Sequence, residues 1–482
     1  MDVLDTTLVG VVALALAVGV ALADWRKGLL ACIAVGFFQD PLRKLWPGES
    51  IYLTALVGAL FAVVALGAAY RGELLTISTT AEWRRFRWPV AMFCLVVVAQ
   101  AVRTLAEQQN VKLAVLGLMS YLAPVTAAAA GYAFARSASM LKRFLVCYAM
   151  FSVAAATGVY LAFLGYDWPV LDQVGAGLIL FAQGVQLDLY PGFMRSPEVA
   201  AWHAAAGVCV LVILGSITKR SGGRLAAVGL ILLLLGAAFL TGRRKVLVEI
   251  VLFLAAYWAS LAYARAGARR VVGVAAMAAL LAWLALSQLL EPDETGPRLA
   301  PYVRHGATGF VDAPDRFSSL GLASVGWAFD QYGLAGAGAG TGSQGGQHFA
   351  GEAELVGGAA EGGLGKVTAE LGLPGLLAAA WVLTALVWAL WRARAEAQRL
   401  SSELAALWYG LLAFLGANAV GFVVASQVYG DLFVLLLLGW CVGFVLAIPR
   451  LATTGQPGTG RSRLATGTVA SRSTFGSRRH RR

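Results

Sequence analysis

Long uninterrupted apolar runs, separated by short polar segments, dominate the chain. Most runs are close to the roughly 20 residues that a helix needs to cross a bilayer, and Leu, Ala and Val fill them without alternation. Only helices and closed barrels satisfy their backbone polar groups in lipid, and continuous runs favour helices. We predict helices at 6–23, 29–40, 51–70, 88–106, 112–134, 143–164, 199–218, 224–241, 246–264, 271–290, 367–391, 404–425 and 430–449. The run at 29–40 is short for a crossing, so a re-entrant or interfacial helix stays open for it.

Composition excludes a soluble protein. Hydrophobic residues make up 59% of the 482 positions and charged residues only 13%, whereas a soluble domain carries about 25% charged residues. We therefore predict an all-α polytopic membrane protein with about 12–13 transmembrane helices. Its single membrane domain covers residues 1–450.

Cysteine and histidine give no support to a metal centre or another cofactor, and we expect none. The five cysteines all fall inside apolar runs, as small hydrophobic residues do, and no CxxC spacing exists. The four histidines are scattered. These residues are Cys32, Cys94, Cys147, Cys209, Cys441, His203, His305, His348 and His480.

Basic residues set the predicted orientation. The segment 451–482 holds seven arginines and no acid, and is rich in Ser, Thr and Gly. We expect a disordered cytoplasmic tail that contacts anionic membrane lipids rather than nucleic acid. Counting crossings back from this tail puts the N-terminus outside, provided that the run at 29–40 does cross. It also gives six inside loops that each contain at least two Lys or Arg, namely 24–28, 71–87, 136–143, 219–224, 265–270 and 392–402.

The two ends of the first run agree with this orientation. Asp2 and Asp5 precede the run without any base. Its end resembles a signal-peptidase site, but Arg26 and Lys27 follow the apolar core instead of preceding it. We therefore expect an uncleaved first helix. Two long segments, 165–198 and 291–365, then lie on the periplasmic side, and the second carries nine acids against three arginines.

A few bases on the predicted outer side run against the positive-inside rule. Arg243, Arg244 and Lys245 stand in a tight turn before a helix, where unpaired N–H groups and the helix dipole favour an anion. Snorkelling to lipid headgroups is the alternative. Arg43 and Lys44, in the short loop after the doubtful second run, are the other exception.

The large outer segment supplies further candidates. Arg316 is one of its three bases, and a salt bridge to a neighbouring aspartate is the alternative to ligand binding. A glycine series at 333–342 lets backbone approach a ligand or the membrane surface. It lacks the strand and the Gly-Lys-Ser/Thr ending of a nucleotide site. His348 and Glu361 follow as possible general bases, although Glu361 equally suits a charge at a helix N-terminus.

The earlier outer segment ends in a helix start. Ser196 offers a capping hydroxyl, a proline takes the first helical position, and Glu198 is an acid in the first turn. Arg195 adds another outer base. His203 lies about one turn into the helix, either as a titratable group near the interface or as a packing residue.

These motifs, in this order, resemble the O-antigen ligase and polymerase superfamily of bacterial envelope enzymes. The Thr-Gly-Arg-Arg turn at 241–244 matches that family's Thr-Gly-(Ser)-Arg turn. Arg316, Trp327 and the Gly-Leu-Ala-Gly-Ala-Gly run at 333–338 match its loop, with Gly333 in place of a proline. The Glu-Leu-Gly-Leu-Pro-Gly stretch at 370–375 matches its next helix start. The resemblance covers roughly residues 190 to 440.

The resemblance implies a GT-C-like fold in the bacterial inner membrane and a metal-independent inverting glycosyltransferase. Its donor would be a glycan linked to undecaprenyl diphosphate, and its acceptor a hydroxyl of another glycan or lipid. The implied diphosphate ligands are Arg243, Arg244, Arg316 and Arg195, with His203 and Lys245 as further candidates.

The chain departs from the family pattern at the residue that would act as the general base. Family ligases carry a histidine about 11 residues before the Gly-Leu-x-Gly helix start, where this chain has Glu361. Either Glu361 replaces the histidine, which we favour, or His348 reaches in from the loop. Polymerase, ligase and protein O-glycosylation activities all stay open. A polysaccharide transporter or flippase is the alternative from another class.

Overall fold

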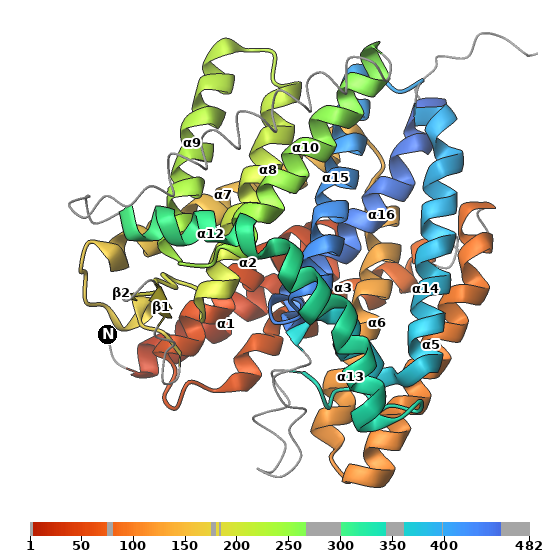
Figure 1. Ribbon diagram of the computed structural model, residues 1–482. Coiled ribbons are helices and arrows are strands. Elements are labelled where there is room, and N and C mark those ends of the chain that lie inside the picture. The colour runs from red at the N-terminus through yellow and green to blue at the C-terminus, as the bar shows by residue number, and fades with distance from the viewer. Residues whose placement is uncertain are drawn as a thin grey trace, which may run out of the picture.

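The computed structural model is almost entirely helical, with one short β-hairpin (Figure 1). It describes residues 3–74, 81–174, 180–182, 185–266, 300–343, 361–397 and 399–454. The first half contains α1 (Val3–Ala23), α2 (Trp25–Leu45), the 3-10 helix η1 (Ile51–Ala55), α3 (Leu56–Tyr70), α5 (Ala81–Gln108), α6 (Val111–Phe134), α7 (Ala138–Phe163) and η2 (Pro169–Leu171). The antiparallel strands β1 (Leu180–Ala182) and β2 (Val185–Leu187) follow. The second half contains α8 (Pro197–Ile217), α9 (Ser221–Leu240), α10 (Lys245–Ala266), α12 (Ala300–Arg316), the π-helix η3 (Phe317–Leu322), α13 (Ala323–Tyr332), α14 (Gly363–Ala397), α15 (Ser402–Val424), η6 (Val428–Gly430) and α16 (Leu432–Thr454).

Ten of the described helices are long and apolar enough to cross a membrane. They coincide with ten of the predicted runs, which confirms a multi-pass helical membrane protein. The predicted run at 6–23 is also a helix, α1, although its apolar part Gly10–Ala23 is shorter. The run at 271–290 lies outside the described residues, so the total of about 12–13 stays a prediction.

Close helix packing forms the centre of the bundle. In α8 and α16, 72% of the most apolar window is buried by other parts of the protein, against 11% for α14. Helix α16 packs along α6 because glycines at the contact bring the backbones together. A Cβ at Gly443 would overlap the carbonyl oxygen of Ala128, and one at Gly131 would lie 2.5 Å from that of Trp440. Small residues of this kind are typical of helix contacts in membranes.

The described loops gather at two ends of the bundle, in the grouping that the charge pattern predicts. At one end Glu73 pairs with Arg26 and, at 3.0 Å, with Arg136, while Lys142 pairs with Glu403 at 2.8 Å. These contacts join three of the predicted inside loops and the first turn of α15, which follows a fourth. The predicted outer segments meet at the other end, as described below. Which end faces the cytoplasm stays a prediction from the basic residues.

Helix α2 corrects the expectation for the second run. It spans 21 residues, which is about 32 Å of helix and enough to cross a bilayer. Arg26 near its start lies at the first end, and Lys44 near its finish donates to the carbonyl of Gly192 at the other, 2.6 Å away. Arg43 and Lys44 therefore belong to the last turn of a helix and not to a loop. Hydropathy missed this turn because its charges are buried against the segment before α8 and not in lipid.

The glycine series also has a different role from the one expected. Ala337 N donates to Ala369 O at 2.6 Å, and Leu373 N donates to Leu334 O at 2.8 Å, so the run docks on a break in α14. The break occurs at Gly372, which has φ 65°. The two motifs that carry the family resemblance thus bind each other. Protein backbone, rather than a ligand, makes the close approach that these glycines permit.

This packing predicts the cost of adding a methyl group to the run. Gly340 and Gly333 both have positive φ, but a Cβ at Gly340 would overlap the carbonyl oxygen of Leu113, whereas one at Gly333 meets open space. We expect Gly340→Ala to destabilise the purified protein by about 2–3 kcal/mol more than Gly333→Ala, measured as thermal unfolding in detergent. Equal losses would show that the backbone contact is not tight.

Candidate functional site

The turn between α9 and α10 carries three adjacent bases and is formed as predicted. Helix α9 ends at Leu240 and α10 begins at Lys245, with Gly242 at φ 67° between them. The three side chains leave the turn toward different partners. Arg243 lies 2.8 Å from Glu198, Arg244 lies 2.6 Å from Asp312, and Lys245 Nζ donates to Gln427 Oε1 at 2.8 Å. The turn therefore connects the start of α8, helix α12 and the segment before α16.

Arg243 is only partly satisfied by its partner. Its Nη2 lies 2.8 Å from Glu198 Oε1, but neither Nη2 nor Nε makes a well-directed hydrogen bond within the described residues. Burial lowers the pKa of the Arg243 guanidinium, and Glu198 acts in the opposite direction. A cation with unused donors is suited to bind an anionic ligand.

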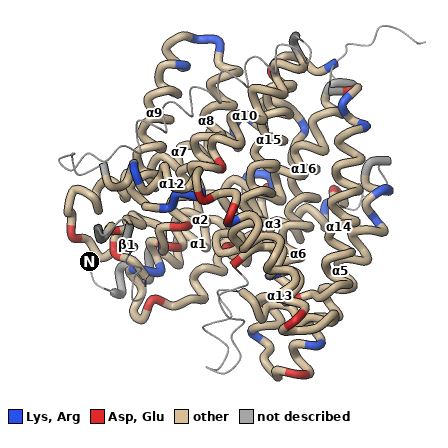
Figure 2. The backbone as a smooth tube through the Cα atoms, in the orientation of Figure 1, with Lys and Arg blue, Asp and Glu red and all other residues tan. Residues whose placement is uncertain are grey.

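Three of the predicted site residues interact electrostatically with a fourth, Lys245. Its ammonium group interacts electrostatically with Glu198 and Glu361, and with the positive charges of Arg243 and Arg316. Arg316 ends α12, and Glu361 lies just before α14; both side chains are exposed. Figure 2 shows basic and acidic residues together near the centre of the molecule, below α12. We call Arg243, Lys245, Arg316 and Glu361 the cationic cluster.

The alternatives for Arg316 and Glu361 can now be compared with the structure. Asp312, a proposed partner of Arg316, pairs with Arg244 instead, and Arg316 makes no ion pair within the described residues. Helix α14 begins at Gly363, so Glu361 lies two residues before the helix, and its alternative role as a charge at the helix N-terminus stays open. Its backbone oxygen is held by the N–H of Ser426, which leaves the carboxylate exposed. His348 lies outside the described residues.

Arg195 has a structural role that the sequence did not predict. Its guanidinium lies 3.1 Å from Asp40 and 2.5 Å from Asp431, both of them buried. Burial lowers the pKa of Arg195, but the two carboxylates more than reverse this and raise it. Because the carboxylates of Asp40 and Asp431 already neutralise its positive charge, Arg195 is not suited to bind a diphosphate. It joins the end of α2, the segment before α8 and the start of α16.

His203 is a packing residue, as its alternative interpretation held. Its side chain is 1% exposed, and Nδ1 is hydrogen-bonded to the hydroxyl of Tyr148 at 2.9 Å. The rings of Phe37, Trp202 and Phe433 surround it. It therefore cannot reach a substrate at the end of the bundle.

Several residues of this region were missed in the sequence. Asp431 accepts from the N–H of Val434 at 2.9 Å and caps α16. An aspartate just before an apolar run is a known signal of a helix start, so this residue could have been found from the sequence. Gln427 and Asp40 gave no local signal. Glu249, one turn after Lys245 in α10, is 6% exposed, and its Oε1 has no hydrogen-bond partner in the described chain. No group of three or more His, Cys, Asp or Glu among the described residues could hold a metal ion.

The buried pair predicts how stability depends on pH. Burial raises the pKa of Asp431, but Arg195, the N–H of Val434 and His203 together hold it below its ordinary value. That ordinary value is about 3.9, so the contribution is complete above about pH 4 and is lost as the pH falls further. We expect Asp431→Asn to destabilise the protein by about 3 kcal/mol at neutral pH, with a smaller difference from wild type at pH 3. Thermal unfolding in detergent across this range measures it; a difference that does not change with pH would contradict the pairing.

No protein-family model matches the chain, and no curated protein matches it significantly. The function of the site has to be inferred from its own residues.

Proposed function

We propose that the protein is a bacterial envelope glycosyltransferase that uses a glycan linked to undecaprenyl diphosphate. It transfers or polymerises that glycan onto an acceptor hydroxyl at the periplasmic face of the inner membrane. The observation that carries the proposal is the cationic cluster, in which Lys245 interacts electrostatically with the exposed carboxylate of Glu361 and with two arginines at a single end of the helix bundle. The motif resemblance agrees with it.

The chemistry of glycan transfer needs both parts of this cluster. The acceptor oxygen attacks the anomeric carbon, the bond from that carbon to the diphosphate breaks, and its electron pair stays on the diphosphate oxygen. Arg243, Lys245 and Arg316 stabilise the negative charge that develops there. Glu361 accepts the proton of the acceptor hydroxyl. The attack and departure take place on opposite faces, so the configuration at the anomeric carbon inverts.

The arrangement also suits a donor that is fixed in the membrane. Arginine matches the oxygens of a phosphate group with paired, charge-assisted hydrogen bonds, and Arg316 has its guanidinium exposed for this contact. The turn at 241–244 follows the apolar helix α9, so its bases stand where a diphosphate would leave the lipid. No nucleotide is required, because the donor already carries the activated bond.

We expect the two exposed cluster residues to be essential for transfer. With a polyprenyl-diphosphate oligosaccharide as donor, Glu361→Gln should lower the turnover number by about 10²–10⁴-fold, and Arg316→Ala by about 10²–10³-fold. Released polyprenyl diphosphate and glycan length report the reaction. Glu396→Gln and Arg392→Ala are matched controls, since both are exposed near the opposite end of α14. Unchanged turnover in both cluster variants would rule out the mechanism.

Transport of a lipid-linked glycan is the competing function. Glu249 favours it, because a buried carboxylate inside a membrane helix often belongs to a substrate or proton pathway. In liposomes, a transporter moves the glycan across the membrane with its bond to the lipid intact. A transferase instead yields free polyprenyl diphosphate. In that case neither the wild type nor Glu249→Gln should move glycan across the membrane with its bond to the lipid intact.

A further inference from the structure

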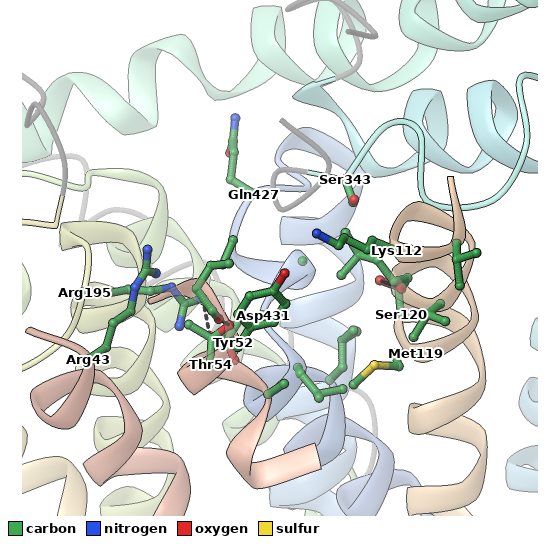
Figure 3. Close-up of a pocket in the computed structure, with 18 residues that line it drawn as sticks. Arg43, Tyr52, Thr54, Lys112, Met119, Ser120, Arg195, Ser343, Gln427 and Asp431 are labelled. Carbon is green, nitrogen blue, oxygen red and sulfur yellow. Dashed lines mark hydrogen bonds and ion pairs between the residues drawn. The ribbon is translucent and has the colours of Figure 1, made fainter. Parts of the chain in front are cut away.

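A cavity beside the cationic cluster combines charged walls with an apolar floor. Its volume is about 420 Å³, and it lies between η1, the first turns of α6 and the start of α16. Gln427 links the two regions, because it accepts from Lys245 and also lines the cavity. In Figure 3, Gln427 stands at the upper edge of the cavity.

Arg43 lines this cavity with donors that the protein does not use. Its side chain comes from the last turn of α2, and the residue is only 7% exposed. Its Nε donates to the carbonyl of Glu49 at 2.9 Å. The two terminal nitrogens make no hydrogen bond within the described part of the chain, although the carboxylates of Asp40 and Glu49 interact electrostatically with the guanidinium. Donors that the protein leaves unused can bind the oxygens of an anionic ligand.

Among the charged residues that line this wall of the cavity, Arg43 is the one without an ion pair in the described part of the chain. Arg195 and Asp431 also line it, but they neutralise one another, and Asp40 is bound to the same arginine. Lys112 approaches from α6 on the opposite side, with Nζ 5.8 Å from the centre of the Tyr52 ring. Figure 3 shows Lys112 and the two arginines on facing sides of the cavity.

The floor of the cavity is apolar and lies along two membrane helices. Val115, Leu116 and Met119 line it from α6, and Leu432 and Leu435 line it from α16. The lining runs from Val111 to Ser120 along α6, a distance of about 14 Å. An occupant therefore needs an anionic head between the cations and a hydrocarbon part that extends toward the interior of the bilayer.

We infer that this cavity binds the phosphate head of a membrane lipid, with the start of its hydrocarbon chain along α6 and α16. Arg43 supplies two parallel donors to the phosphate oxygens, and Lys112 supplies a second positive charge. The site is separate from the cationic cluster and goes beyond glycan transfer. In the proposed transferase this cavity provides a second lipid position beside the donor. The inference does not depend on transferase activity, because the cavity can bind a lipid phosphate without it.

Binding to the purified protein in nanodiscs, measured by native mass spectrometry, tests this site without any glycan donor. The probes are polyprenyl phosphate, the matching polyprenol and inorganic phosphate. We expect polyprenyl phosphate to bind at least about tenfold more tightly than either of the others. Arg43→Gln and Lys112→Gln should each weaken it by about tenfold or more, while Arg392→Gln at the opposite end of the bundle should not.

Two further variants keep the test decisive. Met119→Trp fills the floor but keeps both cations, and should weaken polyprenyl phosphate alone. Glu361→Gln should bind it like wild type, so that loss of transferase activity and loss of this site are distinguishable. Equal affinity for polyprenol and polyprenyl phosphate would overturn the claim that the cavity binds the phosphate group. Equal affinity for inorganic phosphate would overturn the lipid part, and unchanged binding in both Arg43→Gln and Lys112→Gln would overturn the inference as a whole.

Discussion

The ion pairs of Arg195 hold one end of the bundle together. Charges removed from water are tolerated only when they are paired, and here one guanidinium satisfies two aspartates that are otherwise buried. Asp40 lies 155 positions before it in the chain and forms a 3.1 Å contact. Asp431 starts α16 and, with Gln427 four residues earlier, borders the cavity. The position of Lys245, whose Nζ donates to Gln427, depends on the same anchor.

This anchor separates two regions of different chemistry. On one side of Gln427, Lys245 interacts electrostatically with the exposed Glu361 and with arginines from the α9–α10 turn and α12. On the other side, Arg43 and Lys112 stand over an apolar floor. Both regions suit phosphate groups, but only the first has a carboxylate that an acceptor hydroxyl can reach. In the proposed transferase, bond cleavage takes place on one side of Gln427 and lipid binding on the other.

Local patterns in the sequence predicted most of the fold and part of the site. Hydropathy located the membrane helices, and the Ser196 cap and the turn containing Gly242 were legible because each depends on a few consecutive residues. Arg243, Arg316 and Glu361 were each recognisable as charges in segments predicted to lie on one side of the membrane, but their interaction with Lys245 was not predicted. Nonlocal pairing could not be predicted in this way. Nothing near Arg195 indicates that its charge is already neutralised by residues from two distant helices.

The predictions for the last turn of α2 and for the glycine run were wrong for related reasons. A run of hydrophobic residues marks contact with lipid, whereas the end of α2 is buried against protein, and its charges concealed a continuing helix. The glycines were read as open to a ligand because sequence does not show which backbone will approach them. In the structure they bind the break at Gly372.

The central claim is that the cationic cluster faces the outside of the cell, and cysteine accessibility tests it most directly. In a background without the five native cysteines, Ser318→Cys places a thiol beside Arg316, and Gly222→Cys places one at the opposite end; both positions are exposed. A membrane-impermeant maleimide added to cells whose outer membrane alone is permeabilised should label Ser318→Cys at once. It should label Gly222→Cys only after the inner membrane is also opened. The reverse pattern would place the cluster in the cytoplasm and contradict the account.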